Sequence, residues 1–83
     1  MINCDIEFEN AKAKVLDLLW AYDPPQKTWQ SCNRMRYLAL LAMETIGNME
    51  EAAKNNAPGI ISRQLAEYCK RYQQVAGETK YNI

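Results

Sequence analysis

Between residues 29 and 54 the sequence carries apolar residues in alternating steps of three and four, the spacing that places side chains on one face of an α-helix. The series has seven members, and three of them are alanines, so a partner helix can approach this face closely. Gly47 interrupts the segment, and a glycine inside a helix costs up to about 1 kcal/mol relative to alanine. We expect one continuous helix over residues 29–55, with a break near Gly47 as the alternative. The series is Cys32, Met35, Ala39, Ala42, Ile46, Met49 and Ala53.

Two further segments, residues 5–22 and 60–76, repeat this spacing and predict two more helices. Thr28 is the expected N-cap of the middle helix, and Gly77 the expected end of the third helix. Residues 78–83 are then expected to form a frayed tail. The apolar positions are Cys4, Phe8, Ala11, Val15, Leu18 and Tyr22 in the first segment, and Ile61, Leu65, Tyr68, Tyr72 and Val75 in the second.

Short connectors separate the three segments. Asp23-Pro24-Pro25 ends the first helix, and Asn55-Asn56-Ala57-Pro58-Gly59 separates the second from the third. Three amphipathic helices joined in this way predict an all-α, antiparallel three-helix bundle with a long central helix, in a single domain over residues 1–83. The middle helix is the longest, so part of its apolar face should extend beyond its neighbours. A second copy or a partner would cover such a surface, which predicts an oligomer as one outcome.

The charge balance argues against a dedicated nucleic-acid binder. Ten Lys and Arg residues match ten Asp and Glu residues among 83, so the net charge is zero, whereas such proteins usually have a basic excess. The longest apolar run, residues 37–43, is too short to cross a bilayer, which takes about 20 residues. The chain starts without the pattern of a signal peptide, and its three cysteines form no CxxC pair. We therefore expect a cytoplasmic protein with no membrane partner.

The residue types present offer little for catalysis. Histidine is absent, which removes the commonest general base and the commonest metal ligand. The three cysteines follow apolar stripes and are expected to pack in the core, and no glycine-rich phosphate loop is found. The adjacent pair Glu50 and Glu51 would point apart on a helix. We predict no catalytic residue, no metal site and no cofactor, with a ligand-binding or enzymatic helical oligomer as an outside alternative.

One cluster of aromatic and basic residues stands at the start of the middle helix. Trp29, Arg34, Arg36 and Tyr37 combine the residue types that are enriched at protein-protein hot spots. They predict a partner-binding site on this helix. The function that follows is a non-enzymatic interaction module, such as an adaptor, an antitoxin-like protein or a phage-type inhibitor. It would act by self-association, by docking on an unidentified protein partner, or by both.

The alternative is a small DNA-binding regulator that uses the third helix for recognition. Its candidate residues are Arg63, Gln64, Lys70 and Arg71, because arginine and glutamine side chains suit the edges of bases. Residues 55–59 would then be the turn of a helix-turn-helix. That turn is longer than the usual 3–4 residues, and the neutral net charge disfavours DNA further. Nucleic acid is therefore the less favoured partner.

Overall fold

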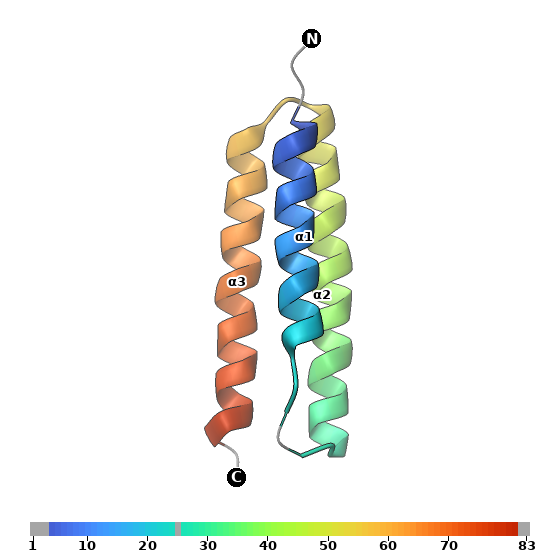
Figure 1. Ribbon diagram of the computed structural model, residues 1–83, viewed down its shortest axis with the longest axis vertical. Coiled ribbons are helices and arrows are strands. Elements are labelled where there is room, and N and C mark those ends of the chain that lie inside the picture. Colours follow the sequence, from blue (N-terminus) through green and yellow to red (C-terminus); the bar gives the residue numbers. More distant parts are fainter. Residues whose placement is uncertain (1–3, 25, 82–83) are drawn as a thin grey trace.

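A computed structural model describes the backbone of residues 4–24 and 26–81, and the side chains of residues 4–24 and 26–77. The chain forms three helices, α1 (Asp5–Ala21), α2 (Trp29–Lys54) and α3 (Pro58–Tyr81), and the described ranges contain no strand. Figure 1 shows that α1 and α3 run in one direction and that α2, the second helix in the chain, runs in the opposite direction. The predicted all-helical chain with three helices is confirmed.

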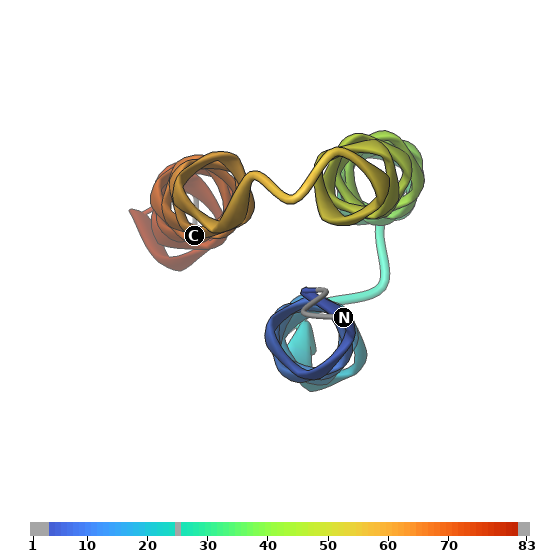
Figure 2. The same cartoon turned by 90° about the horizontal axis from the view of Figure 1, so that it is seen from above.

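The three helices lie at the corners of a triangle, as Figure 2 shows from above, and each helix contacts the other two. The bundle is elongated, with extents of 51 × 16 × 15 Å. α2 has 26 residues and α3 has 24, whereas α1 has 17. α2 therefore does not stand out in length from α3. Beyond the end of α1, the connector of residues 22–28 leads the chain to the start of α2 (Figure 1).

A continuous apolar core fills the space between the helices. Its most deeply buried large side chains are Val15, Leu38, Met49 and Tyr68, none of them more than 1% exposed. The predicted stripes of α1 and α3 contribute to this core, since most of their members are buried. Around these four lie Cys4, Phe8, Ala11, Leu19, Tyr22, Ala42, Ala52, Ala53, Ile61 and Val75.

The buried face of α2 is rotated from the predicted one. Of the seven predicted residues Ala42, Met49 and Ala53 are buried, Met35, Ala39 and Ile46 are partly buried and pack against the core, and Cys32 is exposed. The most deeply buried face follows a neighbouring series with the same spacing, which shares Met35, Ala42 and Met49 with the predicted one. It adds Ser31 and Thr45, which are 2% and 4% exposed. Because these two residues are polar, the series does not appear as a continuous apolar pattern in the sequence. Its members are Ser31, Met35, Leu38, Ala42, Thr45, Met49 and Ala52.

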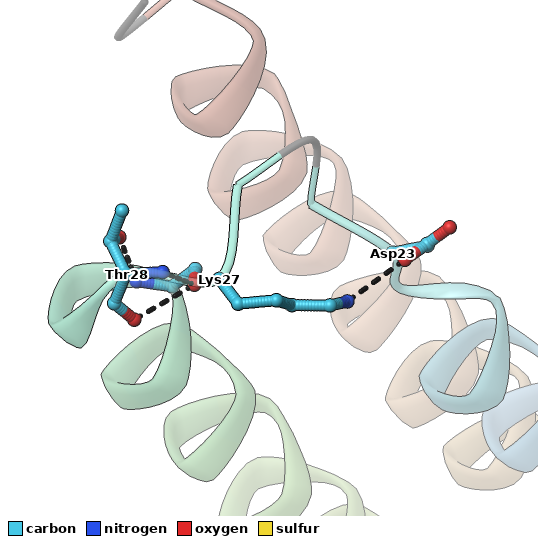
Figure 3. A network of polar contacts seen from close by, with 4 residues as sticks. Asp23, Lys27 and Thr28 are labelled. Atoms are coloured by element: carbon cyan, nitrogen blue, oxygen red, sulfur yellow. Dashed lines mark hydrogen bonds and ion pairs between the residues drawn. The ribbon is translucent and has the colours of Figure 1, made fainter.

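Ser31 also closes the N-terminus of α2. The Thr28 hydroxyl accepts a hydrogen bond from the backbone N–H of Ser31 at 3.1 Å, and the Ser31 hydroxyl accepts one from the Thr28 N–H at 2.8 Å (Figure 3). This reciprocal arrangement is a capping box, and it satisfies two N–H groups near the helix end. The predicted N-cap at Thr28 is confirmed. Beside it, Lys27 pairs with Asp23 at 2.9 Å, but both side chains are exposed, so the pair adds little stability.

Thr28→Ala is expected to lower the free energy of unfolding by about 1 kcal/mol, because the N–H of Ser31 loses its acceptor. Thr28→Ser keeps the hydroxyl and is the matched control. Urea denaturation followed by circular dichroism measures both variants. Equal stability of Thr28→Ala and wild type would show that the box contributes nothing.

The turn between α2 and α3 is built around Asn56. Its φ of 53° is in the left-handed region, which asparagine tolerates better than most residues. The N–H groups of Ala57 and Asn56 donate to the carbonyls of Ala52 and Ala53 at 2.9 and 3.2 Å, the paired bonds of a Schellman motif. α3 then begins at Pro58, where proline's missing N–H costs nothing.

The bounds of α3 differ from the prediction at both ends. The helix starts at Pro58 instead of residue 60, and it runs through Gly77 to Tyr81 instead of ending at residue 76. Gly77 costs about 1 kcal/mol in a helix, which the packing of Val75 and Ala76 against the core can offset. Residues 78–81, expected to fray, are helical, and residues 82–83 lie outside the described part of the chain.

Candidate interaction surface

The four residues predicted to bind a partner do not form one cluster. Trp29 is 76% exposed and Arg36 is also exposed. They are seven positions apart, about two helical turns, so they share a face of α2. Arg34 is partly buried and points to another side, because residues two apart on a helix do not face the same way. Tyr37, 42% exposed, lies towards the edge of the face that holds Trp29 and Arg36.

Sequence reasoning missed two residues of this face. Leu40 and Met43 are 66% and 70% exposed, and they lie one turn apart on α2. With Trp29 and Arg36 they belong to a third series with steps of three and four, on the side of α2 away from the core. We call this series the outer stripe: Trp29, Asn33, Arg36, Leu40, Met43, Gly47, Glu50 and Lys54.

The signal for the outer stripe was present in the sequence but ambiguous. Residues 37–43 are apolar almost throughout, so this segment satisfies several helical faces at once. The choice among faces depends on where α1 and α3 pack, which periodicity within α2 does not reveal. The apolar centre of the stripe is Leu40 and Met43, and charged residues lie towards both ends, Arg36 on one side and Glu50 and Lys54 on the other.

Gly47 lies within the outer stripe. α2 continues through it without a break, and a Cβ added there would meet nothing within 4 Å. The packing of the chain therefore does not require a glycine at this position. Its cost of up to about 1 kcal/mol in helix propensity remains unexplained by the isolated fold. A small residue on an outward face lets another surface approach the backbone closely.

Other exposed apolar residues are more scattered. Ile6 and Trp20, each 74% exposed, share the outward side of α1 but are fourteen positions apart. Ile60, on the first turn of α3, is 43% exposed. Leu16, which is partly buried, lies one turn from Trp20. Among the large apolar residues that are exposed in the described part of the chain, only Tyr37, Leu40 and Met43 on α2 lie one turn from another such residue. The outer stripe is thus the strongest candidate surface in the described residues.

The alternative DNA-binding set on α3 spans two neighbouring sides of the helix, and three of its four residues, Gln64, Lys70 and Arg71, line one groove. Arg63 and Lys70 share one side of the helix and Gln64 and Arg71 share another, because the members of each pair are seven positions apart. A groove of about 420 Å³ between α2 and α3 includes Lys70 and Arg71 in its lining. The carboxylates of Glu44 and Glu67 line the same groove. The basic residues therefore do not make a purely positive surface there.

The arrangement of α2 and α3 is not that of a helix-turn-helix. In that motif the two helices cross at roughly 90–120°. Here α2 and α3 lie side by side over most of their length, as both views show (Figures 1 and 2). Gln64 of α3 accepts a hydrogen bond from the Asn48 side chain of α2 at 3.3 Å, so one of the four candidate side chains already bridges the two helices.

Tyr68 is the one strongly perturbed titratable group in the described residues. Its side chain is 1% exposed at the wall of the α2–α3 groove, and its hydroxyl makes no hydrogen bond with any described residue. Burial, with a smaller contribution from the neighbouring Tyr72, raises the pKa of Tyr68 to about 12. Such a phenol stays protonated at neutral pH, so it does not serve there as a base or nucleophile.

The cysteines do not gather into a site. Cys4 is buried, Cys69 is half-buried and Cys32 is exposed, and all three are free thiols. The prediction that Cys32 packs in the core is wrong, because the rotation of α2 turns it outward. Across the described ranges, no three Cys, Asp or Glu side chains lie close enough together to bind a metal ion. Within the same ranges, no helix has the length and apolar character needed to span a bilayer.

Comparison with known protein families, with curated proteins and with solved structures found no match for this chain. On the surface of the bundle, the outer stripe combines adjacent exposed apolar residues, an aromatic residue and charges of both signs.

Proposed function

We propose that this chain is a non-enzymatic protein-protein interaction module that docks through the outer stripe of α2. The observation that carries the proposal is the exposure of Leu40 and Met43, side by side at 66% and 70%. Single exposed apolar residues are ordinary on protein surfaces, whereas a contiguous group rimmed by polar residues marks an interaction site. Trp29 and Arg36 extend the group, and both residue types are enriched where binding energy concentrates.

The module would belong with adaptors, antitoxin-like proteins or phage-type inhibitors, which act by occupying another protein or another copy of themselves. Three free cysteines, one of them exposed, suit the reducing cytoplasm. The DNA-binding alternative draws little support from α3, because Lys70 and Arg71 share their groove with the carboxylates of Glu44 and Glu67. We therefore propose a protein surface and no nucleic-acid surface.

Affinity capture from a lysate of the native host tests the proposal. The double variant Leu40→Glu and Met43→Glu places two charges at the centre of the stripe, and we expect capture to fall at least about tenfold, since a buried unpaired charge costs several kcal/mol. The matched control is Ile6→Glu with Ile60→Glu, two exposed apolar residues on α1 and α3. It should retain capture. Equal capture by both double variants, or capture of neither a host protein nor a second copy of the chain, would overturn the proposal.

A further inference from the structure

We propose that the occupant of the outer stripe is a second copy of this chain, with the two α2 helices packed antiparallel about a two-fold axis between Leu40 and Met43. This inference rests on the proposed function and deepens it by naming the partner. The outer stripe is complementary to itself in charge and in side-chain size. An interface of this kind is isologous, so it closes at two copies.

The register of the pair follows from the spacing of the outer stripe. In antiparallel helices with steps of three and four, each position of one helix faces one position of the other. With the axis between Leu40 and Met43, every one of the eight positions faces another member of the same series. The facing pairs are Trp29 with Lys54, Asn33 with Glu50, Arg36 with Gly47, and Leu40 with Met43.

Each facing pair is chemically matched. Leu40 and Met43 make an apolar centre, and Gly47 leaves room for the long side chain of Arg36. The Asn33 amide can donate a hydrogen bond to the Glu50 carboxylate. The Lys54 ammonium of one copy faces the Trp29 indole of the other, which is a favourable cation–π partner. The pairing also supplies a role for Gly47, which the isolated fold does not require.

The opposite orientation is disfavoured by the same residues. A parallel pair would set Arg36 against Arg36, Glu50 against Glu50 and Lys54 against Lys54. Like charges placed opposite each other in an interface disfavour that arrangement. The antiparallel register contains no such pair among its facing positions. The charge pattern therefore selects one orientation.

The fold leaves space for this contact. The outer stripe lies on the side of α2 away from the core, so α1 and α3 of each copy lie behind their own α2 and do not obstruct the other bundle. α2 is continuous from Trp29 to Lys54, a span of roughly 37 Å at about 1.5 Å per residue. Towards the edge of the stripe, Tyr37 and Glu44 are both exposed and can meet across the interface.

Sedimentation equilibrium and light scattering test the stoichiometry. We expect the wild-type chain at micromolar concentration to show a mass of about 19 kDa, twice its 9.6 kDa. Leu40→Glu with Met43→Glu should give a monomer of unchanged helicity, whereas Ile6→Glu with Ile60→Glu should remain a dimer. A wild-type monomer over the same range, or a dimer that survives the Leu40 and Met43 changes, would overturn the inference.

Disulfide trapping tests the orientation. In a background with Cys32→Ser and Cys69→Ser, one chain carries Leu40→Cys and a second carries Met43→Cys. Antiparallel packing predicts that oxidation links the two different chains, at least about tenfold more than it links either variant to itself. Parallel packing predicts the reverse, because each position would then face its own copy. Predominant self-linkage would overturn the antiparallel arrangement.

The two proposals fail in distinguishable ways. A monomeric chain that captures a host protein, and loses it on Leu40→Glu with Met43→Glu, overturns the second copy as occupant but supports the docking surface. A monomeric chain that captures nothing overturns both. A dimer lost only in the Leu40 and Met43 variant supports both.

Discussion

Truncating Leu38 to alanine is expected to lower the free energy of unfolding by about 3 kcal/mol, whereas the same change at Leu40 should alter it by less than about 0.5 kcal/mol. The two leucines are two residues apart on α2, but Leu38 is fully buried and Leu40 is 66% exposed. Removing the Leu38 side chain loses its burial and leaves a cavity between the helices. Removing that of Leu40 exposes no part of the core.

The comparison is best made in a Met43→Glu background, so that association through the outer stripe does not contribute. Guanidinium denaturation followed by circular dichroism gives both free energies. The result also decides which face of α2 packs inward. If Leu38→Ala changed the free energy of unfolding only slightly, the result would contradict the observed rotation of α2. It would favour the series predicted from the sequence, which does not include Leu38.

A loss of stability between pH 10 and pH 12 that Tyr68→Phe reduces is the second large expected effect. Part of the loss remains in the variant, because burial also raises the pKa of Tyr72. The pKa of Tyr68 is about 12 in the folded chain, above the ordinary value of 10.0, mainly because burial disfavours the phenolate. The folded state thus keeps a proton that the unfolded state releases. This contribution is complete below pH 10 and is lost as the pH rises towards 12, with a slope of at most about 1.4 kcal/mol per pH unit.

The same variant should be more stable than wild type at pH 7. The Tyr68 hydroxyl is buried and makes no hydrogen bond with a described residue, so its removal relieves a desolvation cost. We expect a gain of about 1 kcal/mol. Tyr37→Phe is the matched control, since its ring is 42% exposed, and it should change neither quantity appreciably. All proteins in this comparison carry Met43→Glu, so that association through the outer stripe does not contribute. Denaturation at pH 7, 10 and 11 compares the three proteins. A Tyr68→Phe variant that is destabilised at pH 7 would show that the hydroxyl is well satisfied in the fold.

The local signals in this sequence predicted the helices well. The prolines after Asp23, the hydroxyl of Thr28 and the asparagines before Pro58 act within a few residues, so their effects on helix ends can be read without knowing the fold. Gly77 was misleading for the opposite reason. Whether a helix continues through a glycine depends on what the following turn packs against, and that is a tertiary property.

The rotation of α2 about its axis could not be predicted in the same way. Its sequence supports more than one face with the spacing of three and four, and the true core series contains Ser31 and Thr45. The residues of the candidate site could not be predicted for the same reason. Arg34 and Arg36 are close in sequence but lie on different sides of the helix, while Leu40 and Met43 belong to an apolar run that fits several helical faces. Only the positions of α1 and α3 separate the inner face from the outer one.

The elongated bundle has a consequence for hydrodynamic measurements. A body with extents of 51 × 16 × 15 Å experiences more friction in water than a sphere of equal mass. A single copy would therefore elute from a sizing column ahead of globular standards and imitate a larger species. Two bundles joined side by side along α2 would double the mass while keeping nearly the same length. Their frictional ratio would fall on association, whereas end-to-end joining would raise it, so sedimentation velocity can report the geometry of the pair as well as its mass.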